Sequence, residues 1–160
     1  MTYVYNYADA ADVGRELLGG KGSGLAEMKA LGIPVPDGFS VTTRACVEYM
    51  RGGRRMPDGL EEEIERHVEL LERQSGKRLG DPADPLLVSV RSGAAVSMPG
   101  MMDTILNLGL TATTAEALGR TTANPRFARD AYRRLIQMYG EVVDGIDAHL
   151  FEDALGRLKD

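Results

Sequence analysis

The sequence has 160 residues, of which 43% are hydrophobic and 27% are charged, and its formal net charge is -5. This composition fits one packed domain, or part of a larger one. The acidic balance argues against a general nucleic-acid-binding protein, although it allows a local basic pocket for an anion. The single Cys46 excludes an intrachain disulfide framework. Because the sequence shows neither a signal-peptide pattern nor a long apolar run, we expect a cytoplasmic protein without nucleic-acid or membrane partners.

A glycine-rich segment with one lysine is the first candidate functional feature. Residues 19–24 read GGKGSG, and Leu25, Met28 and Leu31 follow at near-helical spacing. We expect a glycine loop that opens a helix, which Gly32 ends. The free N–H groups of a helix start favour phosphate, and Lys21 would add a mobile charge. The segment lacks the GxxxxGK[ST] pattern, so its glycines could equally serve the turn alone.

The stretch between this segment and residue 85 predicts ordinary structural elements. Strands are expected at residues 3–5 and 39–42, and a helix capped by Thr42 or Thr43 should run to about Met50. Asp58 and Glu61 form a capping-box pattern before a second helix. The apolar face of that helix comprises Leu60, Ile64, Val68 and Leu71. We expect the basic cluster at residues 52–55 to be solvated, and His67 to be a surface or half-buried residue, since no second metal ligand lies at the required spacing.

The centre of the chain carries the second candidate feature. Residues 86–90 are apolar and partly β-branched, so we expect a buried strand, and Arg91 stands at its end. A loop of small residues and methionines follows, and a second apolar run occupies residues 104–108. A fixed guanidinium beside glycine-bearing backbone suits phosphate binding. The alternative is a tight loop in which Arg91 pairs with a local carboxylate.

The chain becomes helical after residue 110. Thr113 and Glu116 form a capping-box pattern, and Asn124 precedes a proline at the first position of a long helix. The expected apolar face of this helix comprises Phe127, Ala131, Leu135, Met138 and Val142, and that of a last helix comprises Leu150, Phe151, Ala154, Leu155 and Leu158. We therefore expect a mixed α/β (α+β) part over residues 1–110 and a helical part over residues 111–160.

Three stretches together resemble the N-terminal ATP-binding domain of the pyruvate phosphate dikinase family. They are GGKGSGLAEMKALGIPVPDGFSVTT, DPLLVSVRSGAAVSMPGMMDTILNLGL and NPRFARDAYRRLIQMYGEVV. The resemblance covers nearly the whole chain. Phosphoenolpyruvate synthases share the glycine–lysine segment and the arginine strand, whereas SMPGMMDT and RFARDAYRRLIQMYG favour the dikinase.

The resemblance implies a partial ATP-grasp-like fold with a helical C-terminal subdomain. It implies a reaction that interconverts ATP, phosphate and pyruvate with AMP, diphosphate and phosphoenolpyruvate. Lys21 and Arg91 resemble basic residues that contact nucleotide phosphates, and Ser97 to Met102 resemble a loop that closes over them. Arg91 would act catalytically by stabilising charge on the transferring phosphoryl group. The nucleotide-binding residues expected are Lys21, Gly22, Arg91, Ser92, Gly93, Ser97, Met98, Pro99, Gly100, Met101, Met102, Asp103 and Thr104.

The same resemblance limits what we expect of these residues alone. The family's ATP domain continues further and there supplies the acidic Mg²⁺ ligands, and its carrier histidine and pyruvate site lie on other domains. His67 and His149 do not match the carrier-histidine context. We expect ATP as ligand, the remaining dikinase domains as partners, self-association through exposed apolar surface, and no complete reaction by this chain alone. Two alternatives are a stand-alone nucleotide-binding or regulatory module, for which Asp103 is the one candidate magnesium carboxylate near the loop, and an interaction protein. The latter would dock through Arg126, Arg129, Arg133 and Arg134, which otherwise form a solvated helix side.

Overall fold

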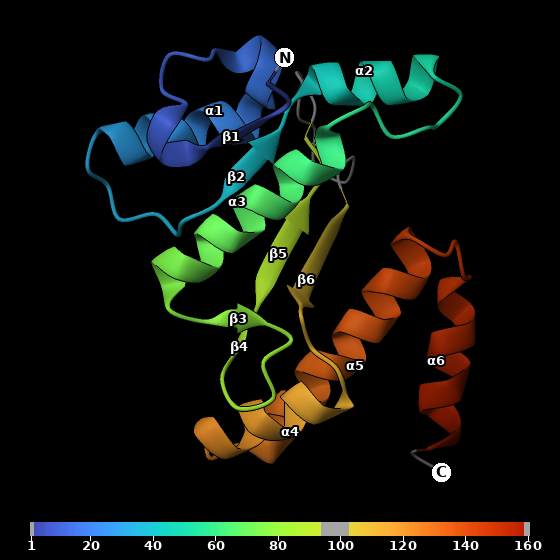
Figure 1. Ribbon diagram of the computed structural model, residues 1–160. Helices are drawn as coiled ribbons and strands as arrows, with labels where there is room; N and C mark the ends of the chain where they lie inside the picture. The colour runs from blue at the N-terminus through green and yellow to red at the C-terminus, as the bar shows by residue number, and fades with distance from the viewer. Residues whose placement is uncertain (1, 94–102, 159–160) are drawn as a thin grey trace. The chain divides into compact units, whose positions relative to one another are not determined.

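The computed structural model describes residues 2–93 and 103–158, and these form two compact units with mixed helices and small sheets (Figure 1). Unit 1 comprises residues 2–76 together with Gly93, and unit 2 comprises residues 77–92 and 103–158. The expected division of the chain into a mixed α/β part over residues 1–110 and a helical part over residues 111–160 stays a prediction. Among the described residues, the helices are too short or too polar to cross a membrane.

Unit 1 joins a two-stranded sheet to three helices. Its elements are β1 (Val4–Asn6), a short 3-10 helix (Tyr7–Asp9), α1 (Arg15–Ala30), β2 (Phe39–Val41), α2 (Thr43–Arg51) and α3 (Leu60–Ser75). β1 and β2 run antiparallel, with Val4 opposite Val41. Val4 is buried with Tyr3, Ala45 and Leu60, and Ile64 packs against this cluster. Both predicted strands and the apolar face of α3 around Leu60 and Ile64 are thereby confirmed.

The helix caps of unit 1 follow the sequence pattern at one helix and depart from it at another. Thr42 caps α2 and accepts a hydrogen bond from the Ala45 N–H at 3.4 Å, as predicted. The predicted Asp58–Glu61 capping box is wrong, because Gly59 in a left-handed conformation (φ 83°) is the N-cap of α3. Asp58 therefore lies one residue outside the capping position. Residues with a side chain rarely adopt the left-handed conformation of Gly59. Because glycine adopts it readily, the helix begins one residue later than the Asp58 pattern predicts.

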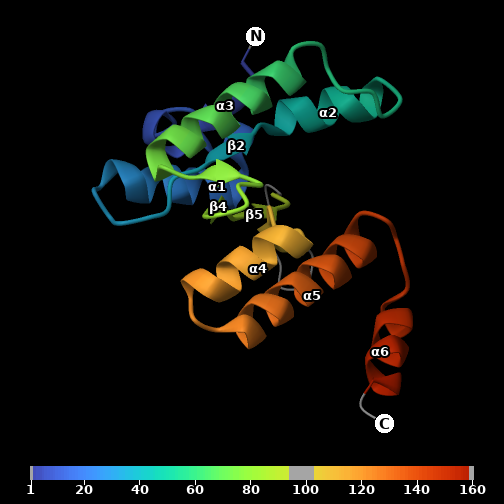
Figure 2. The same cartoon turned by 60° about the horizontal axis from the view of Figure 1, so that its bottom comes forward.

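Unit 2 contains two small two-stranded sheets and three helices. Its elements are β3 (Arg78–Leu79), β4 (Pro85–Leu86), β5 (Val88–Arg91), β6 (Thr104–Leu108), α4 (Ala112–Thr121), α5 (Pro125–Val142) and α6 (Ala148–Arg157). β3 and β4 are parallel, and β5 and β6 are antiparallel. The core comprises Leu110, Ala115, Ala131 and Leu135, against which the β6 residues Ile105 and Leu108 pack. Figure 2 shows α4 and α5 side by side below the strands of this unit.

The predicted buried strand at residues 86–90 is wrong in two respects. The chain divides there into β4, which is buried, and β5, whose last three residues are exposed; Val90 retains 49% of its exposure. Among the strands that the structure describes, β5 is hydrogen-bonded to β6 alone. A short apolar run predicts an extended conformation but does not say what covers the faces of the strand.

The helices of unit 2 confirm one predicted cap and correct other details. Asn124 caps α5 by accepting a hydrogen bond from the Phe127 N–H at 3.0 Å, as predicted. The capping box of α4 is formed by Thr111 and Thr114, so the predicted Thr113–Glu116 pair is wrong. Thr111 stands immediately before the first helical residue and Thr114 three residues later, and both can therefore bond reciprocally.

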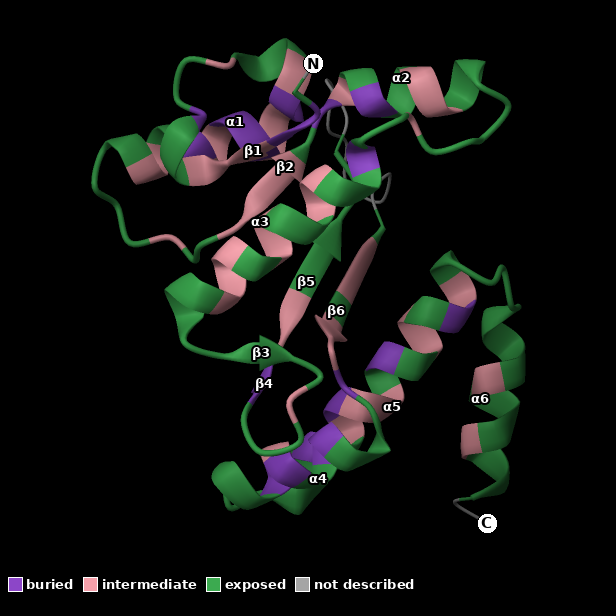
Figure 3. Ribbon diagram, in the orientation of Figure 1, coloured by how far each residue is buried: buried purple, intermediate pink, exposed green. Residues whose placement is uncertain are grey.

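The buried face of α5 also differs from the prediction. It comprises Ala128, Ala131, Leu135 and Gly140, whereas Phe127 and Val142 are 50% and 40% exposed. Small residues were favoured because α4 packs closely here: a Cβ at Gly119 would meet Pro125 Cα at 3.2 Å. α6 buries none of its residues (Figure 3), and Leu150 and Leu158 are 62% and 84% exposed. Hydrophobic periodicity indicates which face a helix can bury and not whether anything covers it.

Candidate functional site

The glycine–lysine segment of unit 1 is helical, with one break. α1 consists of two helical segments joined at Gly19, whose φ of 70° and ψ of 173° lie outside the helical region. The second segment begins at Gly20, so Lys21 stands in its first turn. The expected glycine loop is thus a single residue, and the helix opens earlier than residue 25. Glycine accepts this backbone conformation without steric cost, which explains why the break falls there.

Gly22 brings α1 close to the sheet of unit 1. A Cβ at this position would lie 2.6 Å from Ser40 Oγ and 3.1 Å from Leu18 Cβ. Gly22, Ser23 and Ala26 are all buried, so this helix face is packed through small residues. The neighbouring Lys21 is half-buried. Among the described residues, no carboxylate lies within ion-pair distance of Lys21. Its ammonium group is therefore available to another anion.

Arg15 is a cation at this helix start that the sequence did not indicate. A Cβ on Gly20 would lie 3.1 Å from Arg15 Nη2 and 3.4 Å from Nε, so the guanidinium group lies against the Gly20 backbone. Residues five apart do not face each other on a regular helix. The break at Gly19 changes the direction of the chain between Arg15 and Gly20, and only the folded backbone reveals that they are neighbours.

Four predicted site residues lie at the end of the β5–β6 hairpin where residues 92–103 connect the two strands. Arg91 and Thr104 are direct cross-strand partners. At the next position, the carbonyl oxygen of Asp103 accepts hydrogen bonds from Ser92 N at 3.1 Å and from Ser92 Oγ at 3.3 Å. These bonds join the ends of the two strands, which Figure 1 shows side by side. The hairpin therefore brings Arg91, Ser92, Asp103 and Thr104 together.

Arg91 is an exposed cation at this end of the hairpin. Within residues 2–93 and 103–158, no carboxylate lies within ion-pair distance of its guanidinium group. The alternative in which Arg91 pairs with a local carboxylate is therefore not found there. Gly93 follows, and a Cβ at this glycine would meet no atom within 4 Å. Arg91 thus ends the strand with an exposed guanidinium group, which suits a phosphate.

A family model described as "Pyruvate phosphate dikinase, AMP/ATP-binding domain" matches residues 15–54 and 52–142. The chain belongs to this family. It is 48% identical to the pyruvate, phosphate dikinase of Entamoeba histolytica and 50% identical to that of Clostridium symbiosum, in both cases over 99% of the chain and 18% of the relative. It is 56% identical to the Giardia intestinalis pyruvate, phosphate dikinase over 91% of the chain and 16% of the relative. The chain thus spans less than a fifth of these relatives, and it is similar to part of each. The family resemblance seen in the sequence is confirmed.

Several predicted site residues of this AMP/ATP-binding domain cannot be placed. Ser97, Met98, Pro99, Gly100, Met101 and Met102 lie outside the described residues. Lys21 and Gly22 belong to unit 1, and Arg91, Ser92, Asp103 and Thr104 belong to unit 2. The match of the family model includes both sets.

The two histidines of the chain make local contacts. His67 Nδ1 lies 2.7 Å from the carbonyl oxygen of Glu63, and its ring centroid lies 5.5 Å from that of Phe39, so His67 is half-buried, as predicted. His149 is exposed, with Nδ1 3.5 Å from Glu152 Oε2. Among the described residues, no group of three or more His, Cys, Asp or Glu side chains is arranged to hold a metal ion.

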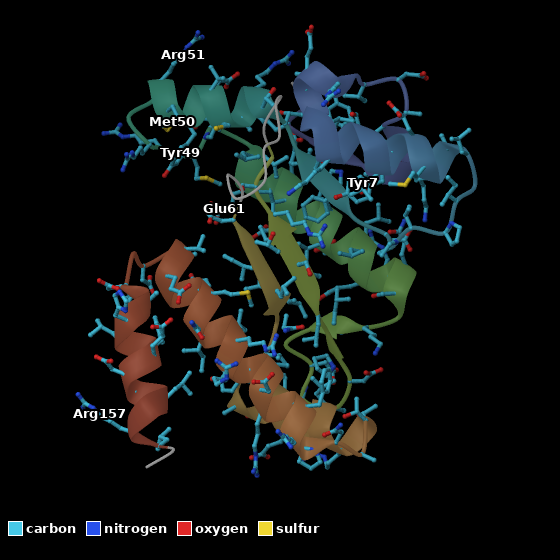
Figure 4. The ribbon with its side chains drawn as sticks, turned by 180° about the vertical axis from the view of Figure 1, so that it is seen from behind. Tyr7, Tyr49, Met50, Arg51, Glu61 and Arg157 are labelled. Atoms are coloured by element: carbon cyan, nitrogen blue, oxygen red, sulfur yellow. The ribbon has the colours of Figure 1, made fainter. Side chains whose placement is uncertain are left out.

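The basic residues proposed as a docking face are partly neutralised by one carboxylate. Arg133 Nη2 and Arg134 Nε donate to Asp130 at 2.9 and 2.8 Å. This favours the solvated, internally paired helix side over a docking face. The basic cluster at residues 52–55 is exposed, as predicted, and the neighbouring Arg51 points away from the ribbon, as Arg157 of α6 does (Figure 4).

Proposed function

We propose that this chain binds the phosphates of ATP as part of a pyruvate phosphate dikinase AMP/ATP-binding domain. The observation that carries the proposal is the connecting end of the β5–β6 hairpin, where the exposed Arg91 stands opposite Thr104, next to the Ser92–Asp103 contact. A guanidinium group without a carboxylate partner among the described residues can form two parallel hydrogen bonds with a phosphate. The matching family is an AMP/ATP-binding domain.

The helix start at Gly20 in unit 1 is a second segment for which we propose phosphate binding. Lys21 in its first turn contributes an ammonium group, and Arg15 against Gly20 contributes a further cation. The first N–H groups of a helix and its partial positive charge add to the attraction for phosphate. The loop residues Ser97 to Met102, proposed from the family resemblance, would close over the phosphates.

The proposed chemistry is phosphoryl transfer from ATP. The complete domain would bind the Mg²⁺ ion. We propose that this domain has an ATP-grasp-like fold and that residues 111–160 belong to its helical subdomain. Arg91 would stabilise the negative charge that develops on the transferring phosphoryl group. The whole reaction converts ATP, phosphate and pyruvate into AMP, diphosphate and phosphoenolpyruvate. Since the chain spans less than a fifth of its relatives, we expect the isolated chain to form no phosphoenolpyruvate. Its exposed Leu150 and Leu158 favour self-association.

Calorimetric titration with ATP tests the proposal. Lys21→Ala and Arg91→Ala should each weaken binding by about 1–3 kcal/mol, the range for a charge-assisted contact. Arg91→Lys should restore only part of the loss, because an ammonium group cannot make the bidentate contact. Arg51→Ala and Arg157→Ala are matched controls that remove exposed cations elsewhere in units 1 and 2. Equal ATP affinity in all four alanine variants would show that the site is wrong.

A further inference from the structure

We propose that Asn107 is a positioning residue for the phosphate site, because its left-handed backbone sets the register that places Thr104 opposite Arg91. The effect on ATP binding rests on the proposed function. The effect on the strand register rests on the geometry of the β5–β6 hairpin alone. Asn107 lies on β6, three residues after Thr104 and away from the connecting end of the hairpin at which Arg91 stands.

The two strands of the hairpin pair with one extra residue on β6. Val88 is opposite Leu108, and Val90 is opposite Ile105, so β5 advances by two residues while β6 advances by three. Leu106 and Asn107 together therefore face the single residue Ser89. This is a β-bulge, which inserts an unpaired residue and shifts the ladder beyond it by one position.

The bulge decides which β6 side chains face the core of unit 2. In a regular strand, Ile105 and Leu108 would lie on opposite faces, because side chains alternate. In this hairpin both pack against the core cluster. Direct cross-strand partners share a face, so Val88 and Val90 lie on that same side. Arg91 and Thr104 consequently lie together on the other face of the hairpin.

Hydrophobic burial alone would not select this register. Without the bulge, Leu108 would still pair with Val88, but Leu106 would take the core position opposite Val90. Leucine and isoleucine have similar size and hydrophobicity, so the two registers bury comparable side chains. Ile105 would then stand opposite Arg91, and Thr104 would move opposite Ser92. The Asp103 carbonyl would lose its Ser92 partner, and an apolar side chain would replace the Thr104 hydroxyl beside the guanidinium group.

Asn107 favours the bulged register, which burial alone does not select. Its φ is 60°, in the left-handed region, which asparagine tolerates better than most residues and β-branched residues tolerate poorly. Its carbonyl oxygen accepts the Leu110 N–H at 3.1 Å. The residue therefore favours the bulged backbone and, with it, the Arg91–Thr104 pair.

Engineered cysteine pairs report the register directly. Ser92 N donates to Asp103, so Arg91 and Thr104 occupy the next, non-hydrogen-bonded position, where Cα atoms are about 4.5 Å apart and a disulfide fits. In a Cys46→Ser background, which removes the exposed native thiol, Arg91→Cys with Thr104→Cys should cross-link under mild oxidation. Arg91→Cys with Ile105→Cys should not.

Changing Asn107 should reverse this pattern in a defined way. With Asn107→Val, the ladder should become regular, the first cysteine pair should lose its cross-link, and the second pair should gain it. Asn107→Gly should keep the first pair, because glycine adopts the left-handed conformation. Deletion of Asn107 should also keep the first pair, because removing the extra residue leaves Thr104 opposite Arg91 in a regular ladder. A first pair that still cross-links in Asn107→Val overturns the proposal. If Asn107→Val does not fold, the deletion variant takes its place. In that case a deletion variant that melts cooperatively and forms the first cross-link supports the proposal. A deletion variant that fails either measurement overturns it.

ATP titration tests the consequence with Arg91 intact. Asn107→Val should weaken ATP binding roughly tenfold, comparable to the loss of one hydrogen bond to a charged group. It should leave adenosine, which has no phosphate, unaffected. The deletion should restore the affinity for ATP. If Arg91→Ala does not change ATP affinity, the proposed function fails, whereas the cross-links still report the register. If Arg91→Ala weakens binding and the register change does not, the positioning role is wrong while the phosphate site stands.

Discussion

Lys21 lies on α1 next to Gly22, Ser23 and Ala26, which are buried. Arg91, in contrast, ends the largely exposed strand β5, which pairs with β6 alone among the described strands. The first cation is held by close packing along a helix face. The second is held by a few backbone features: the bulge at Asn107, the turn at Gly109 and the Ser92–Asp103 hydrogen bonds in the same unit.

The difference shows how a position can be fixed without a large core. Packing of small side chains tolerates no added volume, but a neighbouring side chain can rotate to relieve part of a clash. A left-handed backbone position close to another backbone atom offers no such relief. Substitutions should therefore cost more at the turn of unit 2 than at the packed helix face of unit 1, and each should affect its own unit.

Gly109→Ala should have the largest effect. Gly109 has φ 111°, and an added Cβ would lie 2.5 Å from the Leu86 carbonyl oxygen and 3.0 Å from Leu79 Cδ1. Backbone strain and a clash with backbone together should destabilise unit 2 by about 2–4 kcal/mol. Urea unfolding with amide exchange should show the loss in α4 and α5 and not in α1. Gly80→Ala, at φ 77° with nothing within 4 Å, is the control for strain alone. Equal losses in both variants would argue against the close contact at Leu86.

The sequence predicted those features that depend on nearby residues. The cap at Asn124 and the cap at Thr42 were predicted because a capping side chain bonds an N–H within three residues. Strands β1 and β2 were predicted from short β-prone runs, and the resemblance to the dikinase domain was carried by long motifs. Arg91 at a strand end was likewise evident from the abrupt end of an apolar run.

Other features depended on long-range structure and were missed. The break at Gly19 and the neighbouring Arg15 require the folded path of α1. The bulge at Asn107 was missed because TILNL alternates poorly in either register, and only pairing with β5 resolves it. Phe127 was assigned to a buried face because periodicity does not reveal that a helix packs through its alanines.

Glu63→Ala should have the second-largest effect, in unit 1. One carboxylate oxygen of Glu63 accepts the N–H groups of Tyr3 at 2.8 Å and Val4 at 2.9 Å. Removing this acceptor leaves two half-buried donors without it, which should cost roughly 1–3 kcal/mol. Urea unfolding measures the loss, and faster amide exchange at Tyr3 and Val4 locates it. Glu62→Ala, the exposed neighbour on α3, should leave both measurements unchanged. An unaltered midpoint for Glu63→Ala would mean that solvent replaces these hydrogen bonds without cost.

Gly22→Ala and Gly24→Ala form a matched pair on α1. A Cβ at Gly22 would meet Ser40 Oγ and Leu18 Cβ, whereas one at Gly24 would meet nothing within 4 Å. Ser40 can rotate away and alanine favours the helix, so Gly22→Ala should destabilise unit 1 by only about 0.5–2 kcal/mol. Gly24→Ala should stabilise unit 1 by roughly 0.5–1 kcal/mol. Thermal unfolding measures both shifts. Shifts of the same sign would remove the evidence that this helix face is tightly packed.

Tyr3→Phe should make the stability of unit 1 less dependent on pH in the alkaline range. The hydrogen bond that the Tyr3 hydroxyl donates to Glu48 at 2.5 Å raises the pKa of the phenol above its ordinary value of 10.0. The folded state therefore holds this proton more tightly than the unfolded state. The stabilisation is fully present below pH 10.0 and is lost as the pH rises through the raised pKa. Tyr7→Phe is the control, because it removes a phenol and keeps Tyr3. As the pH rises through this range, the unfolding midpoint should fall less steeply in Tyr3→Phe than in Tyr7→Phe.

Asp130→Asn should have the smallest effect, confined to the acid limb of unit 2. Hydrogen bonds from Arg133, and then from Arg134, hold the pKa of the Asp130 carboxyl below its ordinary value of 3.8. The carboxylate therefore stabilises the folded state above pH 3.8, and this contribution is lost as the pH falls through the lowered pKa. All three side chains are more than a third exposed, so solvent and salt screen the pairs.

Asp81→Asn provides the contrast to Asp130→Asn. The pKa of Asp81 is lowered by the backbone N–H groups of Ala83 and Asp84, which lie 2.7 and 3.1 Å from its Oδ1. An asparagine oxygen can still accept those N–H groups, whereas no amide replaces a carboxylate shared by two arginines. Acid-unfolding midpoints measured at low and high salt should therefore show a salt-sensitive difference for Asp130→Asn and a salt-insensitive one for Asp81→Asn. The same salt response in both variants would mean that the arginines of α5 do not pair with Asp130 in solution, and the docking-face interpretation of α5 would then regain support.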